Sequence, residues 1–84
     1  MKLTVELSLY PIQENYIEII QAFIDAMRTE PDLQVVTNAM STQVCGDYER
    51  VFALVGATLA ATTRRFGKQV LVAKFIPWEL ELQP

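Results

Sequence analysis

Residues 2–27 read KLTVELSLYPIQENYIEIIQAFIDAM, and the spacing of their apolar side chains changes partway along. Every second residue from Leu3 to Leu9 is apolar, which predicts a strand with one apolar face and one polar face. From about Glu14 the apolar residues recur at intervals of three or four, which predicts an amphipathic helix packed on a core. Pro11 and Pro31 end the two elements, because proline lacks a backbone donor and restricts the residue before it.

The rest of the chain predicts a hairpin, a second helix and a last strand. Residues 33–37 and 41–45 are rich in β-branched and alternating residues, with a turn between them. Asp47 is placed to cap a helix that runs to about Phe66, and Gly67 is placed to end it. The apolar stretch from Lys68 to Ile76 predicts the last strand. The order is therefore β-α-β-β-α-β.

This order is typical of the α+β ferredoxin-like sandwich, in which both helices lie on one face of an antiparallel sheet. The chain has 84 residues, enough for one small core, so we expect a single domain over residues 1–84. The last strand is apolar on both of its faces, interrupted only by Lys74. A two-layer monomer covers only one sheet face, so we expect a second copy to cover the other, in a homodimer or tetramer.

Composition excludes several classes of function. The chain has no His, which excludes His-dependent catalytic triads and histidine-liganded zinc, and its single Cys forms no internal disulfide. With 7 basic and 10 acidic residues, it is poorly suited to binding nucleic acid unaided. The uncharged run at residues 51–63 is too short to cross a bilayer. We therefore expect a cytoplasmic protein without a cofactor, a metal site or membrane insertion.

Two groups of polar residues are candidates for binding a small ligand. The polar face of the first strand carries Glu6, Ser8 and Tyr10, which would need hydrogen-bonding partners if that face were covered. A merely solvated strand face explains the same pattern. The hairpin region contributes neutral donors and acceptors: Asn38, Ser41, Thr42 and Gln43. Asn and Ser also stabilise turns by bonding their own backbone, which is the simpler explanation of the second group.

Two segments, residues 8–11 (SLYP) and 40–47 (MSTQVCGD), together with the element order, resemble the YkoF family. The resemblance implies a non-enzymatic binding protein for thiamine or its hydroxymethylpyrimidine moiety, in uptake or salvage of thiamine precursors. On the matching positions it assigns Ser8, Tyr10, Ser41 and Thr42 to the site. Ser41 and Thr42 should point to opposite faces of their strand, so one pocket can use both only at a bulge or at the end of the sheet.

Three other functions compete with ligand binding of this kind. The first is a regulatory or structural oligomer of the same fold, with a different ligand, such as an amino acid, or none. The second is a small cofactorless oxygenase, for which Asn38 and Trp78 are the available polar and aromatic groups. The third is RNA binding through the sheet, which lacks the exposed aromatic pair and basic flanks of stacking modules.

Overall fold

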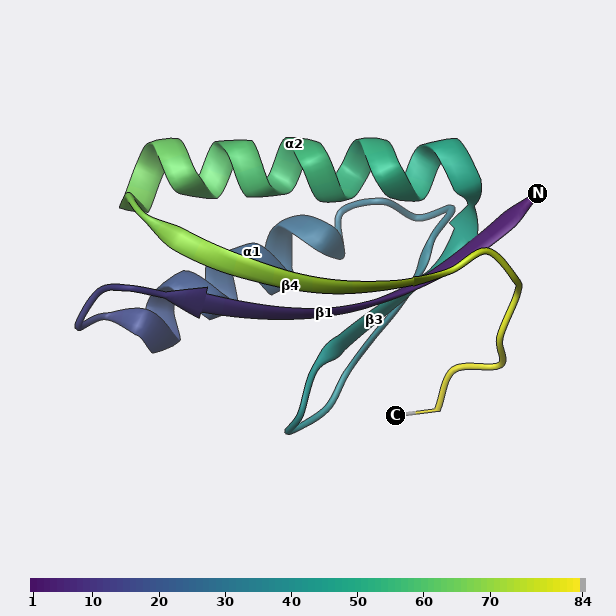
Figure 1. The fold of residues 1–84 in the computed structure, drawn as a ribbon, viewed down its shortest axis with the longest axis horizontal. Coiled ribbons are helices and arrows are strands. Elements are labelled where there is room, and N and C mark those ends of the chain that lie inside the picture. The colour runs from purple at the N-terminus through teal and green to yellow at the C-terminus, as the bar shows by residue number, and fades with distance from the viewer. Residues whose placement is uncertain (84) are drawn as a thin grey trace.

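Four strands and two helices follow one another in the computed structural model, which describes residues 1–83 (Figure 1). The elements are, in chain order, β1 (Lys2–Pro11), α1 (Tyr16–Met27), β2 (Gln34–Thr37), β3 (Thr42–Asp47), α2 (Tyr48–Phe66) and β4 (Gln69–Ile76). The predicted order β-α-β-β-α-β is confirmed.

The strands form one antiparallel sheet in the order β2-β3-β1-β4, and both helices lie on the same side of it (Figure 1). In the register, Leu7 of β1 lies opposite Thr42 of β3 and Ala73 of β4. This is the predicted ferredoxin-like α+β fold. The face away from the helices is called the open face below.

The core lies between the sheet and the helices. The apolar residues of β1 alternate inward as predicted, with Val5 fully buried and Leu3 and Leu7 at most 2% exposed. Ile19, Phe23 and Met27 of α1 and Val51 and Val55 of α2 complete this core. Burying each such side chain contributes about 1.5–3 kcal/mol, before the entropy of ordering it is subtracted.

The ends of α2 follow the predicted signals. The carboxylate of Asp47 accepts a hydrogen bond from the backbone N–H of Arg50 at 3.4 Å, which satisfies a donor that has no partner inside the helix. At the other end Gly67 has φ +98°, a conformation that favours glycine. Arg64 and Arg65 lie in the last turn, where positive charge is favourable.

The segment after β4, residues 77–83, does not continue as a strand. The chain turns after Ile76, and the segment that follows lies against the Thr4 end of the open face (Figure 1). The Thr4 hydroxyl holds it there, donating to the Trp78 carbonyl at 2.8 Å and accepting from the Leu80 N–H at 3.2 Å. Thr4 and Cys45 are therefore buried although they belong to the open face.

Within residues 1–83, neither helix has the length and apolar content that crossing a membrane requires.

Candidate functional site

A pocket forms where β1 and β3 separate. β3 pairs with β1 only as far as Leu7 opposite Thr42, whereas β4 continues to pair with β1 as far as Gln69 opposite Pro11. From Ser8 onward, the side of β1 that would face β3 has no partner strand. Backbone N–H and C=O groups alternate along such an unpaired strand edge, so this edge offers both donors and acceptors.

The pocket has a volume of about 180 Å³ and is closed on one side by α1. Its apolar wall consists of Leu7, Leu9, Ile20, Phe23 and Ile24. Its polar lining consists of Ser8, Tyr10, Thr37, Asn38, Ser41 and Thr42. Ala39 and Met40 complete it at the tip of the hairpin, and Met40 is 86% exposed there. No side chain in this lining carries a formal charge at neutral pH.

The structure brings five of the seven candidate residues to this one pocket: Ser8, Tyr10, Asn38, Ser41 and Thr42. The sequence could not show how two neighbours on opposite strand faces would share a site. Thr42 points to the helix side, is 5% exposed and shares a 3.1 Å hydrogen bond with the Thr37 hydroxyl. Ser41 points to the open face, and because the pocket lies at the end of the sheet, both residues line it.

Glu6 and Gln43 lie beside the pocket and do not line it. Glu6 Oε2 accepts a hydrogen bond from Ser41 Oγ at 3.1 Å, and its Oε1 lies 3.5 Å from Lys74 Nζ. Gln43 lies opposite Glu6 in β1 and Val36 in β2. Glu6 therefore fixes the side chain of Ser41 at the rim of the pocket, whereas Gln43 lies beside the pocket on the open face.

Asn38 stabilises the hairpin turn, which is the simpler explanation that the sequence offered for this residue. Its side-chain Oδ1 accepts hydrogen bonds from the backbone N–H groups of Met40 at 2.8 Å and Ser41 at 3.1 Å. These bonds shape the hairpin tip that overhangs the pocket. Within residues 1–83 its Nδ2 donates no hydrogen bond, which leaves two donors at the rim.

Sequence reasoning missed the apolar wall from α1, the Thr37 hydroxyl, and Lys74. Ile20, Phe23 and Ile24 gave an ordinary core signal, and nothing in a helical period shows which core residues border a pocket. Lys74 could have been singled out from the sequence, because it is the only charged residue in β4.

The oxygenase alternative requires Asn38 and Trp78 to act at one site, and the structure separates them. Trp78, which is 72% exposed, lines a second hollow with Met1, Lys2, Pro77 and Glu79. That hollow lies at the Lys2 end of β1, roughly 26 Å from the Tyr10 end at about 3.3 Å per strand residue. The two side chains therefore share no pocket.

The pocket is suited to holding a small planar ring. Its hydroxyls, backbone edge and Asn38 amide can pair with ring nitrogens and an exocyclic amine, while the apolar wall covers the ring face. Among residues 1–83, no group of three or more Cys, Asp or Glu side chains is placed to hold a metal ion.

A family model described as the YKOF-related family matches residues 2–74 of this chain. No curated protein matches the chain. Among solved structures, a protein from Streptococcus pneumoniae superposes with a TM-score of 0.85 at 17% identity, covering 95% of this chain and 90% of that one. A proposed thiamine biosynthesis/salvage protein from Thermotoga maritima superposes with a TM-score of 0.81 at 18% identity, covering 94% and 85%. At such identities the superpositions show the shared fold.

Proposed function

Because the chain belongs to the YKOF-related family, we propose that it binds thiamine or its hydroxymethylpyrimidine moiety, without catalysis, in the uptake or salvage of thiamine precursors. The description of the structurally similar Thermotoga maritima protein, a proposed thiamine biosynthesis/salvage protein, supports this role. The single buried Cys45 is compatible with a reducing compartment, and we place the protein in the cytoplasm.

The observation that carries the proposal is the convergence of five candidate residues on one pocket at the end of the sheet. An aminopyrimidine presents ring nitrogens that accept hydrogen bonds and an amine that donates them. The unpaired edge of β1 from Ser8 onward offers backbone groups of both kinds, and the hydroxyls of Ser8 and Thr42 can each donate or accept. The Ser41 hydroxyl donates to Glu6 and can accept from a ligand. Phe23 and Ile24 supply apolar surface for the ring.

Binding is tested by the thermal unfolding of the purified chain with thiamine, with hydroxymethylpyrimidine and with a panel of amino acids. A ligand that binds only the native state at a hundred times its Kd stabilises it by about 2.7 kcal/mol. For a domain of this size each kcal/mol raises the midpoint by roughly 4–8 °C. We expect a rise with thiamine or the pyrimidine. A rise with an amino acid alone would favour the regulatory alternative, and no rise in a folded chain would contradict the proposal.

Two variants then locate the site by isothermal titration calorimetry. Ser8→Ala and Thr42→Val each remove one hydroxyl from the pocket, and a lost hydrogen bond of about 0.5–1.5 kcal/mol weakens binding roughly two- to tenfold. Thr58→Val is the matched control, because Thr58 is 5% exposed, lies in α2 and does not line the pocket. Unchanged affinity in both pocket variants would place the ligand elsewhere.

A further inference from the structure

The pocket has an unusual charge environment. Its lining is uncharged, and within residues 1–83 the one carboxylate that bonds a lining side chain is that of Glu6, through the Ser41 hydroxyl. A carboxylate in that position would attract a cationic ligand, because it lies one side chain from the pocket rim and is less than half exposed, at 42%.

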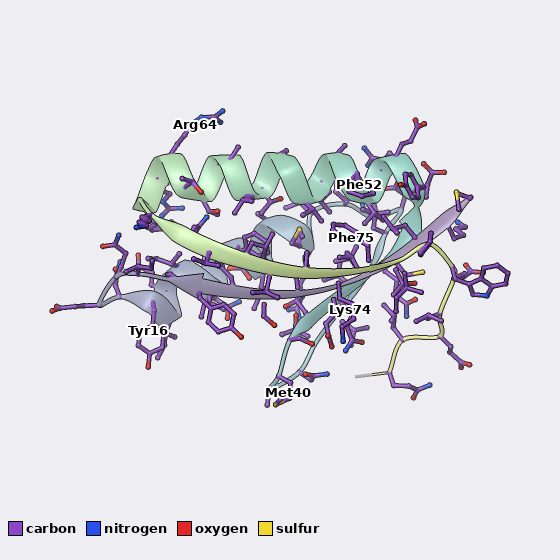
Figure 2. All side chains as sticks on the ribbon, in the orientation of Figure 1. Tyr16, Met40, Phe52, Arg64, Lys74 and Phe75 are labelled. Carbon is purple, nitrogen blue, oxygen red and sulfur yellow. The ribbon has the colours of Figure 1, made fainter. Side chains whose placement is uncertain are left out.

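Lys74 opposes this attraction. Its Nζ lies 3.5 Å from Glu6 Oε1, and the two residues are directly opposed in the register of β1 and β4. Figure 2 shows Lys74 on the side of the sheet away from α2, whereas its neighbour Phe75 points toward Phe52 of that helix. Lys74 is the only charged residue of β4, and it stands between Val72 and Ile76 on the open face.

We infer that Lys74 determines the charge preference of the pocket by compensating Glu6, so that the site gives a cation no electrostatic advantage over an uncharged ring. This inference rests on the proposed function. Hydroxymethylpyrimidine is uncharged, whereas the thiazolium of thiamine carries a permanent positive charge. With Lys74 in place, the charges of Glu6 and Lys74 largely cancel at the distance of a bound ligand, and among the described residues no charged side chain lines the pocket itself.

The volume of the pocket favours hydroxymethylpyrimidine over thiamine. Its volume of about 180 Å³ lies below the roughly 300–1,000 Å³ that encloses a drug-sized ligand. A single substituted ring is therefore a better fit than two rings joined by a bridge.

The test compares affinities for thiamine and hydroxymethylpyrimidine, measured by isothermal titration calorimetry at low salt, in the intact chain and in Lys74→Gln. The variant leaves Glu6 uncompensated, so we expect thiamine to bind two- to fivefold more tightly while the affinity for the pyrimidine stays the same. The gain should shrink at high salt, because both side chains are partly exposed. In Glu6→Gln/Lys74→Gln, the ratio of the two affinities should return to that of the parent chain.

Lys2→Gln is the matched control. It removes the same charge from the same sheet face, but at the far end of β1, where Lys2 lies opposite Asp47. The role assigned to Lys74 would be overturned if Lys74→Gln left the ratio of the thiamine and hydroxymethylpyrimidine affinities unchanged, or if Lys2→Gln shifted that ratio equally. Either result would leave the proposed binding function intact. A parent chain that binds neither compound would instead contradict the proposed function, and this inference with it.

Discussion

Arg50 holds the connection between α1 and β2 against the start of α2. Its guanidinium donates to Asp32 through Nε at 3.0 Å and Nη2 at 3.1 Å, and to Glu30 through Nη2 at 2.7 Å. The hydrogen bonds from Arg50 lower the pKa of the Asp32 carboxyl below its ordinary value of 3.8. The same contacts with Asp32 and Glu30 raise the pKa of Arg50, which therefore remains charged. Arg50 therefore joins the start of α2 to Asp32 and Glu30, which lie 18 and 20 positions earlier in the chain.

The lowered pKa of Asp32 predicts how this contact responds to pH. A carboxyl whose folded pKa is depressed stabilises the fold above its ordinary value of 3.8, and this contribution disappears as the pH falls through the folded pKa. We expect Asp32→Asn to melt slightly below the parent chain at neutral pH, with the difference vanishing under more acidic conditions than pH 3.8. Both partners are about half exposed, so the difference should also shrink with salt. A difference that is constant with pH would show that Asp32 acts through something other than its charge.

Strand β3 runs further than the sequence indicated, ending at Asp47, so Gly46 is a strand residue opposite Leu3. The absence of a side chain at this position is required by packing. A Cβ on Gly46 would overlap a terminal methyl of Leu33, whose side chain is 7% exposed and belongs to the core. Because glycine occupies position 46, the segment that leads into β2 can pass close to β3.

This contact predicts opposite effects for two glycine substitutions. We expect Gly46→Ala to destabilise the fold by about 1–3 kcal/mol, because Leu33 must leave its position in a packed core. Gly56 lies within α2 with nothing within 4 Å of an added Cβ, so Gly56→Ala should stabilise by up to about 1 kcal/mol. Chemical denaturation measures both. Equal effects of the two substitutions would contradict the packing account of Gly46.

At the scale of the whole molecule, residues 1–83 leave most of the open face uncovered. Val70, Val72 and Ile76 are 47%, 55% and 37% exposed, and the C-terminal segment covers only the Thr4 end of this face. Exposed apolar side chains grouped on one sheet face, here on either side of Lys74, are typical of an interface. We therefore retain the expectation that a second copy packs here, in a homodimer or tetramer.

Sedimentation velocity tests this expectation. Val72→Glu places a charge in the middle of the exposed row, and burying it unpaired would be costly, so we expect the assembly to dissociate toward monomers. Ile17→Glu is the control, since Ile17 is 70% exposed on α1, away from the sheet. A parent chain that sediments as a monomer, or an assembly that Val72→Glu leaves intact, would contradict the expectation.

The sequence by itself determined the element order, the caps of α2 and the inward face of β1, and it named as candidates five of the residues that line the pocket. These features follow from periodicity and from contacts between near neighbours in the chain, as with Asp47 and Arg50. Only the tertiary structure decided where the pocket lies, because it depends on the residue at which β3 stops pairing with β1. It also decided that Glu6 bonds Ser41 and faces Lys74, and that Thr4 holds a segment more than 70 positions away. Such contacts depend on register and on the course of the chain in space, which local pattern does not encode.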